Sequence, residues 1–464
     1  MRDLTQGSVH KNFLIFSIPI IISSVLSSAF GVINTSIAGL FLGAKGLAAT
    51  SAPSAYFSII YSVFFGFAYG MAVYMGNLFG AKEYERLKKI MVTTFCFTIA
   101  ATLLIGGISL FLWRPVFAFL NIEDAILEDS LTYYRMMCMH MCLAMVNHFF
   151  ITACNAIGET RYPLILSILS SALTIGGNYL AVGVFDFGVF GIGMSNIFAG
   201  LVVALLYAIR FRGYFKEMGV HKIRVVPRLR YFTVLLPYSI PNIIQQGSMY
   251  LAFLLMSPVR NGLGYAVMAA SSIASQIGNM CQTVYYASAK TSANYIAQCI
   301  GAKKYENIRK AVGVAFIQGC LFFFPVLAVM LLFPDVICGL FIDQAADPQT
   351  WEYAKLYIRY VLPFIVCNMT CGIFHSVFRG IKANKHLVIA STVCTVAQVI
   401  VAYAATPAFG ILGLYASTVA GWFCEAVYVL IIYFSGHWVP KSIRLRVLAS
   451  GKSKGVRSEK TPTW

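Results

Sequence analysis

Charged residues are scarce in this sequence: Asp, Glu, Lys and Arg together make up 11% of its 464 residues. Soluble proteins carry about 25%, so a soluble globular domain is excluded. Intrinsic disorder is excluded as well, because 59% of the chain is hydrophobic and 14% is aromatic. Apolar stretches recur along the chain, and a transmembrane helix needs about 20 such residues. The composition therefore predicts a polytopic membrane protein.

Motifs of nucleotide-dependent and hydrolytic chemistry are also missing. The sequence has no Walker lysine motif, kinase signature, Gly-x-Ser-x-Gly elbow or metalloprotease motif, and no soluble segment long enough for an ATPase. The helical spacing of Cys367, Cys371 and His375 could mimic a metal stripe, but nothing supplies convincing further ligands. We therefore expect no enzyme, no cofactor and no metal site.

The apolar stretches predict an all-α fold with twelve transmembrane helices. The alternation typical of β-barrel strands is absent, so helices are the only way to span the bilayer. The predicted spans are 12–39, 51–78, 91–118, 131–157, 163–184, 190–212, 231–258, 266–299, 310–340, 351–380, 387–406 and 411–435.

Acidic residues are fewer than basic ones: 17 Asp and Glu accompany 35 Lys and Arg, a net charge of +18. Segments predicted on one side of the membrane hold 28 of the 35 basic residues, whereas Glu123, Asp124, Asp343 and Asp347 lie in loops on the other side. The positive-inside rule then predicts a multi-pass plasma-membrane protein with both termini in the cytoplasm. We expect the basic tail from residue 436 to contact anionic lipid headgroups rather than nucleic acid.

An internal repeat divides the chain. Residues 80–89 read GAKEYERLKK and residues 301–310 read GAKKYENIRK, an offset of 221, and matches near Leu47 and Phe187 recur at offsets of 221 and 222. An even number of spans per copy makes the two copies parallel, an architecture of transporters whose substrate site lies between the halves. The predicted divisions are an N-lobe (1–212), a basic linker (213–230), a C-lobe (231–435) and a basic tail (436–464).

These segments also resemble the multidrug and toxic compound extrusion (MATE) family. The resemblance is carried by the duplicated Gly-Ala-Lys-x-Tyr-Glu segments, by Asn34-Thr-Ser-Ile-Ala-Gly39, by Pro237, and by Arg379-Gly380-x-Lys382. It covers essentially the whole chain. It implies a V-shaped, two-lobed exporter that alternates between outward- and inward-open states and uses a proton or sodium gradient to expel organic compounds.

The resemblance also places amides where such exporters commonly have carboxylates. Asn34, Asn178, Gln245 and Asn368 fall at these positions, although some relatives share the amide at Asn178. An amide keeps the hydrogen bonding but cannot take up or release a proton. The four amides either cross-link helices within each lobe or contact the substrate directly.

Polar residues form a stripe along the predicted helix 266–299. Ser275, Asn279, Gln282, Tyr286 and Lys290 step by 4, 3, 4 and 4, which keeps them within about 80° of one helix face. The repeat places a weaker stripe on helix 51–78, made of Ser54, Ser58, Tyr61, Phe65 and Tyr69. We expect both stripes to line the central cleft, with Lys290 opposite Tyr69, and packing against other helices is the alternative.

Few ionisable groups remain within the predicted spans. Glu425 is the one carboxylate well inside a span, roughly 14 Å from the cytoplasmic end at 1.5 Å per residue. Intramembrane charges are costly and are functional candidates by default. We therefore name Glu425 first and His148 second as ion-coupling residues. For Glu425 the alternative is a structural ion pair or a neutral, hydrogen-bonded acid.

Together these features predict a monomeric, secondary-active exporter of small organic compounds or drugs, coupled to protons or sodium ions. The alternative is a flippase for a lipid-linked or anionic substrate, because Lys290, Arg379 and the missing acids favour an anion. The expected partners are a small-molecule substrate, a coupling ion and membrane lipid, with no nucleic acid.

Overall fold

The computed structural model describes residue 4 and residues 6–51, 53–120, 126–342, 344–345 and 347–440, and the regular structure in these ranges is helical. Glu123, Asp124, Asp343 and the tail from residue 441 lie outside the described residues. The first half contains α1 (Val9–Ser51), α2 (Ser54–Gly80), α3 (Tyr84–Phe111), α4 (Trp113–Leu120), α5 (Leu127–Ala156), α6 (Arg161–Asn178), the π-helix η2 (Tyr179–Val184) and α7 (Gly188–Glu217). The second half contains α8 (Leu229–Thr233), α9 (Leu236–Asn261), α10 (Tyr265–Gly301), α11 (Glu306–Leu332), α12 (Pro334–Gly339), α13 (Pro348–Tyr360), η3 (Leu362–Phe364), α14 (Ile365–Gly380), α15 (Asn384–Phe409) and α16 (Ile411–Phe434).

Several predicted spans differ from these helices. The helix predicted at 12–39 continues to Ser51, and the span predicted at 231–258 runs across the break between α8 and α9. The helix predicted at 91–118 ends at Phe111, and α4 follows it as a separate short helix. The helix predicted at 310–340 ends at Leu332, where Pro334 starts the short α12. The helix predicted at 351–380 is interrupted by η3 around Pro363. Proline lacks the N–H that a continuing helix needs, which explains the last two breaks.

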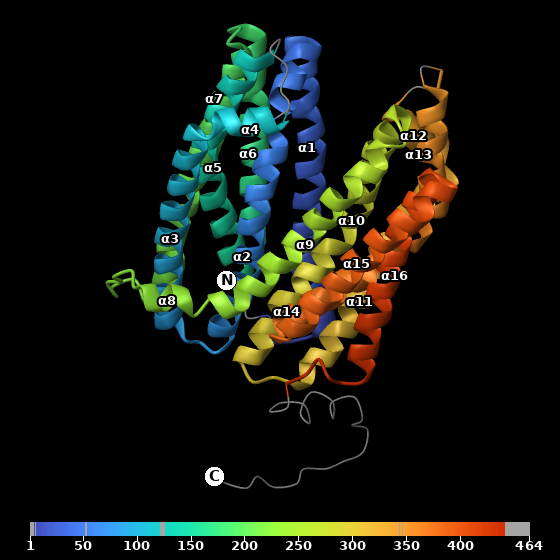
Figure 1. The fold of residues 1–464 in the computed structure, drawn as a ribbon. Coiled ribbons are helices and arrows are strands. Elements are labelled where there is room, and N and C mark those ends of the chain that lie inside the picture. The colour runs from blue at the N-terminus through green and yellow to red at the C-terminus, as the bar shows by residue number, and fades with distance from the viewer. Residues whose placement is uncertain are drawn as a thin grey trace.

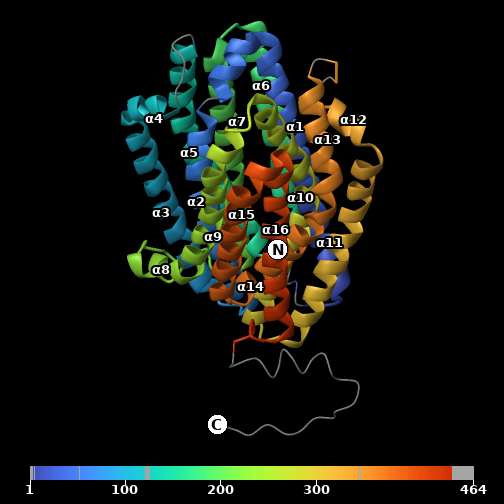
Figure 2. The ribbon, with the colours of Figure 1, turned by 45° about the vertical axis from the view of Figure 1, so that its right-hand side comes forward.

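The helices form two groups that meet at one end and diverge at the other. Figure 1 shows them together at the lower end and apart at the upper end, and Figure 2 shows the same molecule turned by 45°. Each group has its own hydrophobic core. The larger core joins residues of α10, α11, α13, α14 and α16 to the beginning of α1, and the second joins residues of α2, α3, α5 and α7.

The first long helix of each half, α1 in the first and α9 in the second, crosses between the two groups of helices. Near its beginning α1 packs with α10 in the larger core, through Phe13 and Phe16, and further along it reaches α6, where Ser23 and Ser167 share a hydrogen bond of 2.7 Å. In the same way, the beginning of α9 packs on α2, where the Ser239 hydroxyl donates to the Phe67 carbonyl at 3.1 Å. The two groups are therefore held together through these crossing helices.

The duplicated Gly-Ala-Lys segments form matching turns at the lower end. Lys82 and Lys303 both have a positive φ, 59° and 57°, and each turn closes with a 2.9 Å backbone hydrogen bond, from Glu83 to Leu78 and from Lys304 to Cys299. A positive φ followed by such a bond is a common way to end a helix. The sequence repeat at this offset is thus also a repeat of local backbone structure.

Glycines let the two groups touch at the lower end. A Cβ added at Gly80 of α2 would clash with the carbonyl of Gln298 on α10, and one added at Gly301 of α10 would clash with the carbonyl of Asn77 on α2. Gln298 also donates to the Ala156 carbonyl of α5 at 2.9 Å and accepts from the backbone N–H of Leu4. The lower end is therefore closed by reciprocal backbone contacts at repeat-related positions.

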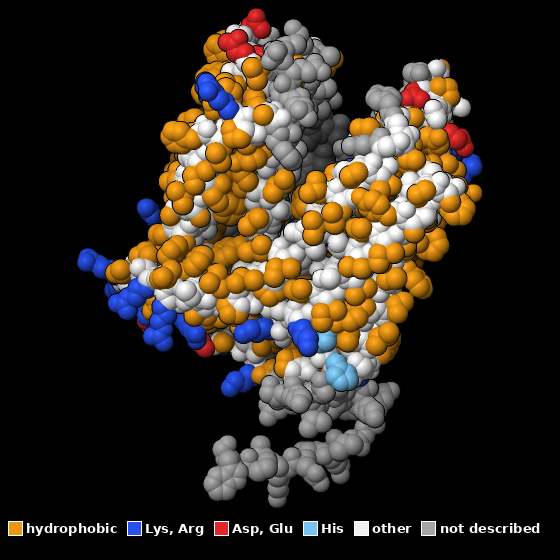
Figure 3. Space-filling model, viewed as in Figure 1, with side chains coloured by type: hydrophobic (Ala, Val, Ile, Leu, Met, Phe, Trp, Pro, Cys, Tyr) orange, Lys and Arg blue, Asp and Glu red, His pale blue; other side chains and the backbone are white. Residues whose placement is uncertain are grey.

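Within the described residues, ten helical segments are long and apolar enough to cross a membrane, and the long helices α9 and α10 fall outside this set. The outer faces of these helices expose large apolar side chains such as Leu104, Ile209 and Ile400. Figure 3 shows this apolar surface around the middle of the molecule, with most Lys and Arg side chains in view gathered near the lower end and Asp and Glu near the upper end. The chain is a multi-pass membrane protein.

Candidate functional site

A cavity of about 320 Å³ lies at the base of the diverging groups. One of its walls is Tyr69 of α2, and the other walls come from α9, α10, α14, α15 and α16. Tyr69, Lys290 and Glu425 on its walls lie nine to eleven residues from the lower ends of their helices, or roughly 14–17 Å at 1.5 Å per residue, whereas Arg379 lies in the last turn of α14. Six of the predicted site residues line it: Tyr69, Gln245, Tyr286, Lys290, Asn368 and Glu425. We call it the lower cavity.

Arg379 joins three helices at this cavity. From the last turn of α14 its Nη2 donates to Oε1 of Gln245 on α9 at 2.7 Å, and its guanidinium lies 4.4 Å from the ring centroid of Tyr69 on α2. A guanidinium binds both an amide oxygen and an aromatic face well. Arg379 thus connects the two groups of helices where they meet.

Glu425 and His375 form a buried pair on the wall of the lower cavity. Oε1 of Glu425 on α16 lies 2.9 Å from Nε2 of His375 on α14. At this distance the two groups form an ion pair when both ring nitrogens of the imidazole carry a proton. Cys371 and Cys394 also interact with the Glu425 carboxyl. In the part of the chain that the structure describes, no three His, Cys, Asp or Glu side chains are grouped as a metal site requires.

Positive charge exceeds negative charge in the lower cavity. Lys290 and Arg379 line it, and Glu425 is the one Asp or Glu among its described lining residues. Neither cation has a carboxylate within 4.0 Å in the described parts of the chain. The cavity therefore attracts negatively charged groups more than a neutral cavity of the same shape.

The four predicted amides each contact another side chain. Nδ2 of Asn178 donates to Oδ1 of Asn34 at 3.2 Å, which links α6 to α1 away from the lower cavity. Gln245 accepts from Arg379, and Asn368 accepts a hydrogen bond from the hydroxyl of Tyr285. All four thus bridge neighbouring side chains, and Gln245 and Asn368 do so on a cavity wall.

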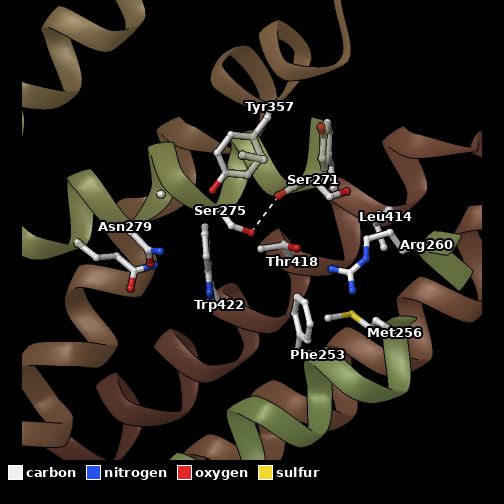
Figure 4. Close-up of a pocket in the computed structure, with 14 residues that line it drawn as sticks. Phe253, Met256, Arg260, Ser271, Ser275, Asn279, Tyr357, Leu414, Thr418 and Trp422 are labelled. Carbon is white, nitrogen blue, oxygen red and sulfur yellow. Dashed lines mark hydrogen bonds between the residues drawn. The ribbon is translucent and has the colours of Figure 1, made fainter. Parts of the chain in front are cut away.

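A second cavity lies further along the α10 stripe. Ser275, Asn279 and Gln282 line it, and its volume is about 220 Å³. Figure 4 shows it between α9, α10, α13 and α16, with Arg260 on one side. Trp422 lines both cavities, so its indole stands between them. We call this second space the upper chamber. The predicted stripe of α10 is therefore divided between two spaces.

Tyr61 and His148 line neither of these two cavities. Tyr61 lies in a row of rings with Phe57 and Phe65, and its hydroxyl oxygen is buried without a hydrogen-bond partner. The His148 ring lies 4.5 Å from the ring of Phe65, centroid to centroid. Both residues belong to the first group of helices, Tyr61 on α2 and His148 on α5.

The lining residues without a predicted role at the site include His375, Trp422 and Arg260. A signal for the first was present in the sequence, because Asn368, Cys371, His375 and Arg379 step by 3, 4 and 4 and so share one face of a helix. This is the same spacing that revealed the α10 stripe. Trp422 and Arg260 have no comparable pattern around them.

The chain is similar to known transporters in sequence and in fold. A family model described as MatE matches residues 19–180 and 241–404. The probable multidrug resistance protein YoeA of Bacillus subtilis is 21% identical over 347 residues, which cover 73% of this chain and 75% of that protein. The structure matches an outward-facing multidrug resistance transporter of the MATE family with a TM-score of 0.83, at 18% identity and over 97% of this chain and 98% of that one. It also matches a Pyrococcus furiosus transporter of the MOP superfamily, described as having a binding pocket of reverse polarity, with a TM-score of 0.84, 19% identity and the same coverage.

Proposed function

The chain belongs to the MatE family of multidrug efflux (MATE) transporters, and from this premise we propose that it is a secondary-active exporter of small organic compounds that works by alternating access. It acts as a monomer in the plasma membrane, with both termini in the cytoplasm. The charge distribution supports this orientation, because the basic side chains gather at the lower end, where the duplicated turns lie.

The proposed architecture has twelve transmembrane helices in two six-helix lobes related by a parallel repeat. The lobes comprise 1–212 and 231–435, joined by the linker 213–230 and followed by the tail 436–464. The matching turns at Lys82 and Lys303 support the repeat. The polar cavity linings of α9 and α10 are consistent with two further spans that face protein rather than lipid.

Alternating access needs an end that can open and close. In the proposed orientation the contact between Gly80 and Gln298, with its repeat counterpart between Gly301 and Asn77, is the cytoplasmic gate, and it is closed. The lower cavity then faces the outside between the diverging lobes. Opening this gate while the upper ends approach each other would expose the same cavity to the cytoplasm.

Coupling in this proposal rests on the pair of Glu425 and His375, which is the single observation that carries it. The four amides cannot exchange a proton, whereas this pair holds a titratable carboxyl and a titratable imidazole on the cavity wall. Imidazole and thiol neighbours suit a proton better than a hard cation, which prefers oxygen ligands. His148 is the second candidate, since its titratable ring lies in the first group of helices, where it packs against Phe65.

A second function is favoured by the charge of the lower cavity. Lys290 and Arg379 lack carboxylate partners within the described residues, so an anionic or lipid-linked substrate would be bound and flipped there. The similar Pyrococcus furiosus transporter is described as having a reversed pocket polarity that suggests a different function. This description concerns that protein, and it supports testing anions here.

Two assays separate these functions. An exporter lowers the accumulation of a fluorescent cationic dye in cells that produce the protein, and this effect disappears in Glu425→Gln. A flippase leaves dye accumulation unchanged, and its removal from the native host causes a lipid-linked intermediate to accumulate. If neither assay responds, both proposals are wrong.

A further inference from the structure

The upper chamber carries the features of a binding site of its own. It has a volume of about 220 Å³, below the roughly 300–1,000 Å³ of pockets for drug-sized ligands. Ser275 and Asn279 on its rim are exposed, so the chamber is open along α10. These dimensions suit a small molecule of one or two rings that enters from the space between the two diverging groups of helices.

Arg260 supplies a positive charge to this chamber without a matching negative one. Its guanidinium lies 4.1 Å from the ring centroid of Phe253, and its Nη2 donates to the hydroxyl of Ser257 at 3.0 Å. No Asp or Glu is among the described residues that line the chamber, and Arg260 forms no ion pair within the described chain. A guanidinium has five N–H donors, so several remain available to an anion.

Polar groups and aromatic faces complete the chamber. The Ser271 hydroxyl oxygen is buried and has no hydrogen-bond partner among the residues that the structure describes. Figure 4 shows Ser275 and Thr418 on the side toward which the Arg260 guanidinium is directed. The walls include four aromatic residues, Phe253, Tyr357, Tyr415 and Trp422. Tyr415 is fixed by a 3.0 Å hydrogen bond to the Tyr353 carbonyl, so this wall is held in place.

We infer that the upper chamber binds a small aromatic anion, a carboxylate or a sulfonate, with its charged group on Arg260 and its ring between the aromatic walls. A cation is disfavoured because the chamber holds a positive charge and no carboxylate. A small inorganic anion is disfavoured because it is strongly hydrated. Placing it against four aromatic side chains would remove water from the ion without giving it polar partners. This site is separate from the lower cavity and does not depend on the direction or coupling of transport.

The test is equilibrium binding of tritiated 2-naphthoate to the purified full-length protein in lipid nanodiscs, without any gradient. Its uncharged counterpart of the same shape, 2-naphthamide, serves as the matched ligand. Wild type is expected to bind the acid at least tenfold more tightly than the amide. Arg260→Gln is expected to weaken binding of the acid by about 10- to 100-fold, the range of a charge-assisted hydrogen bond, and to leave binding of the amide within twofold.

Arg114→Gln is the matched control, because it removes a cation from the exposed surface, outside both cavities. It should change naphthoate binding by less than twofold. If Arg260→Gln does not fold, Thr418→Val tests the same chamber without altering charge and should weaken the acid severalfold. Equal binding of acid and amide, or loss of binding in Lys290→Gln but not in Arg260→Gln, would overturn the inference. Because no transport is measured, a failed efflux assay leaves this result unaffected.

Discussion

Oε1 of Glu425 and Nε2 of His375 lie 2.9 Å apart on the wall of the lower cavity, on helices α16 and α14. Both side chains are buried, so the pair is shielded from bulk water. The cavity beside them contacts both groups of helices through Tyr69 and Arg379. A change in protonation at this pair is therefore placed where it can alter how the two groups meet.

A proposed role of His375 in proton coupling can be distinguished from a role as a polar, hydrogen-bonding side chain. Replacing it by Gln keeps a hydrogen-bond donor beside Glu425 but removes the titratable ring. We expect the gradient-driven part of dye efflux to fall at least tenfold, while dye binding measured at one fixed pH stays within twofold. Ser376→Ala, also on the cavity wall, is the control and should leave both quantities unchanged. Unaltered gradient-driven efflux in His375→Gln would remove this residue from the mechanism.

The positive charge of the lower cavity should select between substrates. Replacing Lys290 by Gln removes a repulsion on cations of about 1–3 kcal/mol, taking a separation of about 6–16 Å and an effective dielectric constant near 20. We expect the ratio of cationic to anionic dye efflux to rise by about 5- to 150-fold. Arg114→Gln alters an exposed surface residue and should leave the ratio unchanged. An equal ratio in both variants would show that Lys290 does not face the transported molecule.

The contact at Gly301 should control closure of the lower end. An added methyl group there clashes with the Asn77 carbonyl, and overpacking of this kind costs about 1–3 kcal/mol. Gly301→Ala should therefore favour the state with this end open. In a background without reactive native cysteines, Tyr286→Cys should then react faster with an impermeant maleimide applied from the side of the duplicated turns.

Gly313→Ala is the matched control for this closure experiment, because a Cβ at Gly313 meets nothing within 4 Å. Equal labelling in the Gly301 and Gly313 variants would contradict a gate at this contact.

The α10 stripe should be accessible from the upper end. Cysteines placed at Ser275 and Asn279 should react with an impermeant reagent applied from that end, because both positions are exposed. A cysteine at Ile277, which is fully buried, should react at least tenfold more slowly. Equal protection at all three positions would mean that the stripe packs against protein and lines no open space.

Much of the fold follows from local sequence patterns. Apolar stretches and the duplicated turns at Lys82 and Lys303 depend on neighbouring residues, so both can be recognised without a structure. The predicted span boundaries were wrong where a short helix follows a long one, as at Pro334. The sequence stays apolar across the bend between the two helices, so it reads as one continuous span. Hydropathy alone cannot separate one bent span from two short helices.

The site was less predictable because its contacts are distant in sequence. The stripe on α10 identified Tyr286 and Lys290 through helical spacing alone. The pairing of Glu425 with His375 brings together residues 50 positions apart, and Arg379 meets Tyr69 across the two groups of helices. Such pairs depend on how helices pack, which residue spacing within one helix does not encode.

The proposal is tested most directly by efflux of a cationic dye from proteoliposomes, first under an imposed pH gradient and then under a sodium gradient, with wild type and Glu425→Gln compared. We predict efflux that follows the pH gradient in wild type and falls to the rate without a gradient in Glu425→Gln. Wild-type efflux that ignores both gradients, or a Glu425→Gln variant with unchanged pH dependence, would contradict coupling through Glu425.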